Sequence, residues 1–213
     1  MKLYWGPYTC ALGIHVLLEE IGKPYETAKV DVMGGEAKKP PFLAINPKGA
    51  VPVLVRDDGS TLTEFGAIAT WLARTNPDKG LLPEGVEDEV RALEMMDYAV
   101  ATLHMKGVVR MMAPEKVEPK DVLHAVTGLG KSSLKQEGET MVRTAFGILD
   151  TQLAGKTFAS GPRFGVADAA LFYCERWAPS LGVELPANVQ AHFERMKARP
   201  AVQRALQAEG ERV

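Results

Sequence analysis

Short apolar runs separated by turns dominate the first eighty residues and predict a small mixed sheet with helices. Residues 2–5 form a predicted strand, and residues 10–21 repeat apolar positions at helical spacing until Gly22 and Pro24 end the helix. Residues 25–32 include alternating and β-branched side chains, as a second strand does. A strand, a helix and a strand in this order favour a parallel strand pair.

A predicted hairpin and a further helix complete the first domain. The strand-like runs 51–56 and 60–63 are separated by Asp57-Asp58-Gly59, and Asp-Gly is a strong signal for a hairpin turn. Residues 65–74 then return to helical spacing. The order strand-helix-strand followed by strand-strand-helix is that of a thioredoxin-like domain.

The pattern changes after the turn-rich segment 76–85, because long helical periods replace the short strand runs. The expected fold is an N-terminal thioredoxin-like α/β domain packed on a C-terminal all-helical domain. Its predicted boundaries are 1–78 for the first domain, 79–86 for the linker and 87–213 for the second domain. Helices of the second domain are predicted over residues 87–112, 131–153, 166–177 and 188–199, the last one ended by Pro200.

The composition restricts the partners more than the fold. The chain has 213 residues, of which 46% are hydrophobic and 24% charged, as in ordinary globular proteins. A net charge of -2 provides no basic surface for nucleic acid or for an anionic membrane. No apolar run is long enough to span a bilayer, and no signal-peptide pattern is present. A small-molecule partner and a cytoplasmic location are therefore expected.

Cys10 is the candidate reactive residue, because it stands between a strand-following loop and a predicted helix. Free backbone N–H groups and the positive end of a helix stabilise a thiolate and lower the thiol pKa below about 8.5. The alternative is a small buried hydrophobic residue, which we expect of Cys174 in the middle of a helix. Dithiol redox proteins carry a resolving cysteine where this chain has Gly13, so Cys10 needs an external thiol such as glutathione.

Two further positions predict a site for a peptide-like ligand. Pro52 cannot donate to a sheet ladder, so the backbone of Val51 is free to pair with a ligand. A cis Val51-Pro52 bond would turn that backbone toward Cys10, whereas an ordinary edge proline is the alternative. Glu64 and Phe65 open a helix, where N–H groups bind a carboxylate and the Glu64 side chain binds an ammonium group. Such an amino-acid head group is present in the γ-glutamyl end of glutathione.

Several segments along the whole chain match one known family. They are Met1-Lys2-Leu3-Tyr4 with Cys10 and His15, Phe42-Leu43-Ala44-Ile45-Asn46-Pro47-Lys48-Gly49, Val51-Pro52-Val53-Leu54, Leu62-Thr63-Glu64 with Ala67-Ile68, Val166-Ala167-Asp168-Ala169, and Trp177-Ala178-Pro179. With these segments the chain resembles the cytosolic glutathione transferases, most closely their bacterial beta class. The resemblance implies a detoxifying homodimer that conjugates glutathione to small apolar electrophiles without a metal.

The resemblance also implies roles for the first-domain residues. Cys10 would contact the glutathione sulfur, and the Val51 backbone would pair with the cysteinyl unit beside cis Pro52. Glu64 together with Phe65 would hold the γ-glutamyl group.

The helical domain contributes the other site residues by the same resemblance. His104 and Lys106 would line the site, with Lys106 toward the electrophile, and Trp177 would border the electrophile. Asp97 would reach into the glutathione site of a partner subunit, which implies a dimer. Met105 separates His104 from Lys106, whereas the family's histidine and lysine are adjacent, so one of the two is expected to face the site and we favour His104.

Other departures from the family affect the head-group pocket and the folding of the second domain. Phe65 replaces a usual Gly or Ser and Ala11 a usual serine, so the pocket is expected to be bulkier and less polar. Residues 33–35 offer no match for the lysine that contacts the glycine end of glutathione. Gly165 replaces a usual Ser or Thr, which leaves Asp168 to form half of a capping box.

Two other functions remain open. A mixed disulfide at Cys10, released by a second glutathione, would make the chain a glutathione-dependent thiol-disulfide oxidoreductase. The bulky Phe65 and the missing glycyl anchor would suit a non-catalytic glutathione-transferase-like binding protein. No metal site is predicted, because His124 and His192 have no ligand partners at helical spacing, and His15 is expected to have a hydrogen-bonded structural role.

Overall fold

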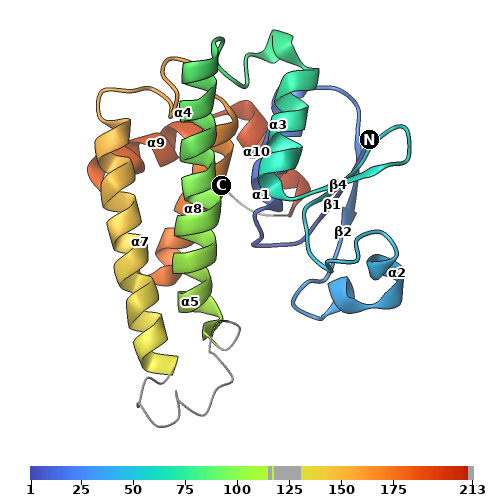
Figure 1. The fold of residues 1–213 in the computed structure, drawn as a ribbon, viewed down its shortest axis with the longest axis horizontal. Helices are drawn as coiled ribbons and strands as arrows, with labels where there is room; N and C mark the ends of the chain where they lie inside the picture. Colours follow the sequence, from blue (N-terminus) through green and yellow to red (C-terminus); the bar gives the residue numbers. More distant parts are fainter. Residues whose placement is uncertain (115–116, 118–130, 211–213) are drawn as a thin grey trace.

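The computed structural model describes residues 1–114, 117 and 131–210. Figure 1 shows a mixed sheet with its helices beside a group of long helices. The predicted fold class, a thioredoxin-like α/β domain packed on an all-helical domain, is confirmed. His124, one of the histidines considered for a metal site, lies outside the described residues.

The sheet contains the predicted parallel pair and the predicted hairpin, and β2, β3 and β4 are shorter than predicted. β1 (Lys2–Trp5) pairs in parallel with β2 (Glu26–Lys29) and antiparallel with β3 (Val53–Val55), which forms a hairpin with β4 (Thr61–Thr63). The strand order is β2-β1-β3-β4. β2 covers half of the predicted run 25–32, because its ladder ends where the four residues of β1 end.

The two faces of the sheet carry different helices. α1 (Ala11–Ile21) and α3 (Phe65–Thr75) share one apolar cluster with Leu3 and Leu54, whereas η1 (Glu36–Lys38) and α2 (Pro40–Leu43) cover the opposite face. The short helices η1, α2 and η2 (Pro77–Lys79) were not predicted from the sequence pattern.

α1 is buried on nearly every side, because it packs against α3 and β1 and also against two helices of the second domain. This position explains why the first two turns of α1 are apolar on every side apart from the buried His15. The apolar cluster continues through α1 into the helical domain without a break. The two domains therefore share one core.

A single long helical segment forms one side of the second domain, as predicted for residues 87–112. It begins as α4 (Val86–Asp97), takes wider π-helical turns in η3 (Tyr98–Val108) and ends as α5 (Val109–Met112). The Val109 N–H donates to the His104 carbonyl five residues earlier, as π turns require. α7 (Lys131–Leu153) packs along η3 and α5 (Figure 1).

The remaining helices connect the second domain to the first. α8 (Val166–Leu181) packs between α4 and α1, and α9 (Ala187–Lys197) follows it. α10 (Pro200–Ala208) packs on α1 and was missed by the sequence analysis, since Pro200 starts this helix at its first position after the chain leaves α9. No helix in the described ranges is long and apolar enough to cross a membrane.

Gly13 allows the two domains to approach closely. A Cβ at Gly13 would lie 2.6 Å from the Ala169 carbonyl oxygen on α8 and 2.7 Å from the Phe65 ring. The position that lacks a resolving cysteine is thus one at which α1, α3 and α8 leave no space for a side chain.

Asp168 forms the half capping box expected at the start of α8. Its Oδ2 accepts the Gly165 N–H at 2.7 Å, and its Oδ1 accepts the Ala159 N–H at 2.7 Å. A Cβ at Gly165 would lie 2.7 Å from the Leu81 carbonyl oxygen, which explains why glycine replaces the usual hydroxyl residue.

Candidate active site

Cys10 is the N-cap residue of α1 and faces the segment that precedes β3. Its Sγ lies 3.9 Å from the Val51 carbonyl oxygen, within range of a weak S–H hydrogen bond. The Val51-Pro52 peptide bond is cis, as expected. Main-chain hydrogen bonds outside helices and strands include none from Val51 among the described residues. The structure therefore brings together the predicted thiol and the predicted ligand-pairing backbone.

The thiol of Cys10 is a weak acid in this setting. Burial raises its pKa to about 12, and the negative charge of Glu64 adds to the effect, while a hydrogen bond to its own backbone opposes it. The expected stabilised thiolate is therefore wrong, because loss of solvation outweighs the helix N-terminus. At neutral pH, Cys10 is a hydrogen-bond donor. Cys174 is a fully buried packing residue, as predicted.

A cavity of about 510 Å³ opens beside Cys10 at the junction of the two domains. The sheet domain lines it with the loop before α1, part of η1 and the residues before cis Pro52. The helical domain contributes one residue from η3 and one from α8. Lining residues that bear on chemistry are Tyr8, Cys10, Lys38, Val51, His104 and Trp177.

Two aromatic side chains form the wall of the cavity on the helical side, and a third packs behind them. His104 and Trp177 line it, with ring centroids 4.8 Å apart, and both pack on Tyr173. The Tyr173 hydroxyl lies 3.4 Å from His104 Nδ1, and burial lowers the pKa of His104 to about 4. His104 is therefore neutral at pH 7. The Trp177 Nε1–H is buried without an acceptor among the described residues.

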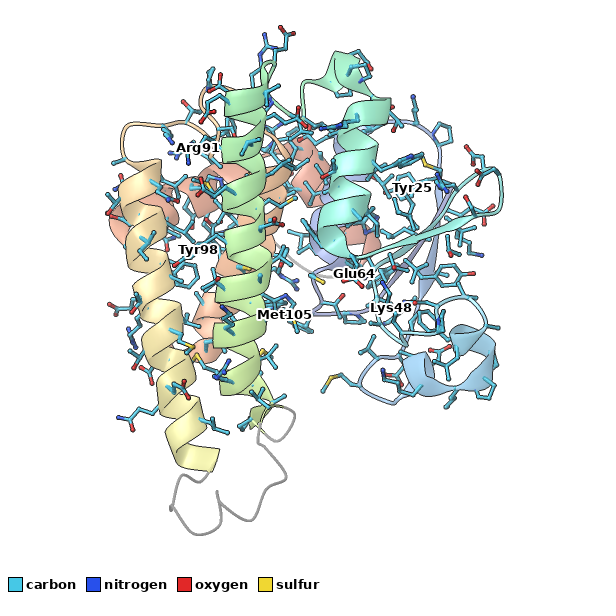
Figure 2. The ribbon with its side chains drawn as sticks, in the orientation of Figure 1. Tyr25, Lys48, Glu64, Arg91, Tyr98 and Met105 are labelled. Carbon is cyan, nitrogen blue, oxygen red and sulfur yellow. The ribbon has the colours of Figure 1, made fainter. Side chains whose placement is uncertain are left out.

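Glu64 stands at the start of α3 with φ 71° and ψ 129°, outside the regions that non-glycine residues favour. Its carboxylate is 68% exposed and accepts a hydrogen bond of 2.6 Å from Lys48 Nζ, which also donates to Thr63 Oγ1. Figure 2 shows Glu64 and Lys48 together at the edge of the sheet domain that faces the long helix of Met105. The carboxylate is thus presented to solvent.

Phe65 does not fill the head-group pocket. Its ring is 3% exposed and turns into the domain interface, 5.3 Å from the Tyr173 ring and next to Gly13. The expectation that Phe65 makes the pocket bulkier is therefore wrong, because its ring points away from the Glu64 carboxylate. The Phe65 backbone remains at the first position of α3.

Lys106 and Asp97 lie apart from the cavity. Lys106 is exposed and does not line the cavity, whereas His104 does, as the sequence analysis favoured. Asp97 is exposed, and its Oδ1 lies 3.6 Å from the Cβ position of Gly66 near the start of α3. Neither residue contributes to the cavity of its own chain.

Two cavity residues, Tyr8 and Lys38, were missed from the sequence, as was Tyr173, which packs behind the cavity wall. Tyr8 has φ 57° and Lys38 donates from Nζ to the Lys48 carbonyl oxygen at 3.2 Å. Tyr173 shares a helix face with Trp177, and this i, i+4 spacing could have identified it. No spacing signal indicates Lys38, because the η1 turn brings it to the cavity.

A second cavity, of about 540 Å³, lies between α4 and α7 and contains neither cysteine. Arg91 and Tyr98, which Figure 2 shows on the side of the long helix toward α7, are among its lining residues. We find no comparable set of chemically reactive side chains there.

His15 and His192 are both buried beside carboxylates. His15 Nδ1 lies 3.0 Å from Glu209 Oε1, so the predicted hydrogen-bonded structural role is confirmed. His192 lies between Asp168 Oδ1 at 2.9 Å and Glu175 Oε1 at 2.7 Å. Among the described residues, no group of three His, Cys, Asp or Glu side chains could hold a metal ion.

Comparisons with known families agree with the resemblance. The model of the glutathione S-transferase N-terminal domain matches residues 9–75, and that of the C-terminal domain matches residues 99–200. Glutathione S-transferase GstA of Escherichia coli O157:H7 is 34% identical to this chain, over 99% of each.

Solved structures extend the comparison to the fold. A sphingomonad glutathione S-transferase complexed with glutathione is 33% identical, covers 99% of both chains and superposes with a TM-score of 0.82. A beta-class glutathione S-transferase from Sphingomonas chungbukensis is 32% identical over 99% of both chains, with a TM-score of 0.81.

Proposed function

This chain belongs to the glutathione S-transferase family, and from that premise we propose that it conjugates glutathione to small apolar electrophiles in the cavity beside Cys10. The observation that carries the proposal is the meeting of Cys10 and the Val51 backbone with His104 and Trp177 in one cavity between the domains. The first pair suits a thiol-containing peptide, and the second pair offers an apolar wall for the electrophile.

Cys10 acts as a donor in this proposal. A thiol with a pKa of about 12 stays protonated at neutral pH and donates its S–H to the glutathione sulfur. That hydrogen bond favours the glutathione thiolate, which is the attacking group. The thiolate forms the new S–C bond, and the leaving group departs with the electron pair of the bond that breaks.

The same pKa makes the oxidoreductase function the weaker candidate. Formation of a mixed disulfide requires the Cys10 thiolate to attack or to leave, and both steps are slow for a thiol that holds its proton. The binding-protein function loses one of its arguments, because the Phe65 ring is directed into the domain interface.

Residues of the sheet domain supply groups that fit the glutathione backbone. The free backbone of Val51 suits pairing with the cysteinyl unit beside cis Pro52, as in strand addition. Glu64 and the N–H of Phe65 at the start of α3 suit the ammonium and carboxylate of the γ-glutamyl end. We assign the glycyl carboxylate to Lys38, the lysine that lines the cavity.

The helical domain completes the proposed site. His104 and Trp177 border the electrophile, and the unpartnered Trp177 Nε1–H suits an electrophile that carries an acceptor atom. Asp97 is exposed near the start of α3, and we propose that it reaches the glutathione site of a partner subunit in a homodimer. The role of Lys106 and the cytoplasmic location stay predictions.

Calorimetric titration of glutathione into the wild-type protein and into Cys10→Ala tests the site. We expect wild-type binding with a Kd between about 1 μM and 1 mM, and weaker or unchanged binding with slower conjugation in the variant, since it keeps Val51 and Glu64 but loses the S–H donor. If glutathione does not bind to the wild-type protein, the proposed function is contradicted, and the non-catalytic glutathione-transferase-like binding protein becomes the favoured alternative.

The pH dependence of alkylation separates conjugation from redox chemistry. In wild-type protein without glutathione, iodoacetamide should modify Cys10 slowly at pH 7, with a rate that still rises above pH 9. Cys174→Ala assigns the signal to Cys10. A rate that levels off below pH 8 would show an activated Cys10 thiolate and would favour the oxidoreductase.

A further inference from the structure

Tyr8 lines the cavity from the loop between β1 and α1, two residues before the thiol. Its side chain is 64% exposed, although it lies beside Cys10 and shares the cavity with His104 and Trp177. A large aromatic ring at this position faces any molecule that reaches the sulfur.

The backbone at Tyr8 is unfavourable for an aromatic residue. Its φ of 57° lies in the left-handed region, which is sterically unfavourable for a residue with a bulky side chain. Among the described residues, Tyr8 and Glu64 are the non-glycine residues with positive φ, and both lie around the proposed site. Backbone outliers of this kind cluster at binding sites, which favours a functional role for the Tyr8 ring.

Arg176 fixes the orientation of the Tyr8 ring. The guanidinium carbon of Arg176 lies over the ring, 5.0 Å from its centroid. Arg176 belongs to α8 and directly precedes Trp177, so the rigid helix that carries one aromatic wall residue also holds the second one in place. With one face of the ring against Arg176, the opposite face is free for a second planar group.

We propose that Tyr8 is a specificity-determining residue whose ring, held by Arg176, stacks on electrophiles with a planar aromatic ring at the reacting carbon. This inference rests on the proposed function, because the electrophile has to meet a glutathione sulfur beside Cys10. His104 and Trp177 give apolar contact to aryl and alkyl electrophiles alike, whereas stacking on the Tyr8 ring is gained by planar aromatic electrophiles and not by small alkyl electrophiles.

Calorimetry with three ligands tests the proposal without requiring turnover. Glutathione, S-methylglutathione and S-(2,4-dinitrophenyl)glutathione are titrated into wild-type protein, Tyr8→Phe and Tyr8→Gly. We expect wild type and Tyr8→Phe to bind the dinitrophenyl conjugate about three- to tenfold more tightly than the methyl conjugate. Tyr8→Gly should bind both conjugates equally and glutathione as the wild type does, because glycine accepts φ 57° without strain.

The kinetic counterpart compares 1-chloro-2,4-dinitrobenzene with iodomethane. Tyr8→Gly should lower kcat/KM about three- to tenfold for the aryl halide and leave it unchanged for the alkyl halide. Val86→Ala, which removes an exposed apolar side chain outside the cavity, should change neither value.

Other results of these experiments would contradict the proposal. A preference for the aryl conjugate that survives in Tyr8→Gly, or that disappears in Tyr8→Phe, contradicts stacking by the ring. An equal loss for all three ligands in Tyr8→Gly contradicts it as well, since Tyr8 would then shape the glutathione site. If wild-type protein binds glutathione but does not prefer the aryl conjugate, only the Tyr8 proposal fails; if it does not bind glutathione, the proposed function fails with it.

Discussion

Helix α8 contributes to two polar regions that differ in exposure, one fully buried and one open to solvent. On one side of α8, Asp168 and Glu175 hold His192 in a cluster with no exposed side chain and hydrogen bonds of 2.7 and 2.9 Å. The second region is the rim of the proposed site, which comprises Trp177 in the cavity wall, Arg176 over the exposed Tyr8 ring, and the exposed Glu64 carboxylate at the start of α3.

The difference separates residues that stabilise the fold from those that bind. In the buried cluster, the polar groups are hydrogen-bonded to one another, apart from Glu175 Oε2, so removal of one residue leaves its partners unpaired in the core. On the rim, Tyr8 and Glu64 are exposed and held in unfavourable backbone, which the surrounding structure has to stabilise. Substitutions in the cluster should therefore change stability, and substitutions on the rim should change binding.

Asp168→Ala should have the largest effect on stability. It removes the acceptor for two backbone N–H groups, those of Ala159 and Gly165, and one carboxylate partner of His192. We expect the free energy of unfolding to fall by about 3–5 kcal/mol in urea denaturation. The exposed Asp58→Ala is the matched control, and its loss should be much smaller. Equal losses in the two variants would remove the distinction between cluster and surface.

The charge of His192 should make the stability of the cluster depend on pH. Burial opposes the charge, but Glu175 and Asp168 outweigh it and raise the pKa of His192 to about 10. Because this pKa lies above the unfolded value of about 6.5, the charged pairs stabilise the fold fully below pH 6.5 and lose this effect as the pH rises toward 10.

Urea denaturation of wild type and His192→Gln at several pH values measures this effect. The variant should be less stable by about 3 kcal/mol at pH 6, and the difference should shrink steadily as the pH approaches 10. Changes in groups distant from the cluster cancel in the comparison, so the difference reports His192 together with its two carboxylate partners. A difference that stays constant with pH would mean that His192 is neutral in the cluster.

Gly13→Ala tests the close packing of α1, α3 and α8 between the two domains. Its Cβ would meet the Ala169 carbonyl oxygen at 2.6 Å and the Phe65 ring at 2.7 Å, so we expect a loss of about 1–3 kcal/mol in the free energy of unfolding. Gly147→Ala, whose Cβ would meet nothing within 4 Å in α7, is the control and should be neutral or stabilising. If Gly13→Ala leaves the free energy of unfolding unchanged, the two domains can shift enough to accommodate the added methyl group.

Glu64→Gly should give the smallest change and the opposite sign. Glycine relieves the backbone strain at φ 71°, and the exposed pair with Lys48 contributes little, so the free energy of unfolding should rise by about 1 kcal/mol. Glutathione binding, followed by calorimetry, should weaken. Glu94→Gly in α4 is the control and should lose about 1 kcal/mol. If Glu64→Gly lowers the free energy of unfolding, then Glu64 stabilises the fold as the residues of the buried cluster do, and the distinction between the two regions fails.

The sequence indicated where the candidate site lies, but not its protonation state or the directions of its side chains. The positions of Cys10, cis Pro52, Glu64 and His104 followed from motifs, because each occurs in a short local pattern. The Cys10 pKa, the direction of the Phe65 ring and the cavity contacts of Lys38 did not, since desolvation and side-chain direction depend on segments distant in sequence.

By itself, the sequence determined the fold class, the parallel β1–β2 pair, the β3–β4 hairpin and most helices, because periodicity and turn residues act over a few neighbours. It also determined the family, through motifs spread over the chain. Only the tertiary structure decided that Cys10 keeps its proton, that Gly13 is needed by Phe65 and α8, and that Tyr8 faces the site. Burial, close approach and strain arise when distant segments pack, and no local pattern contains them.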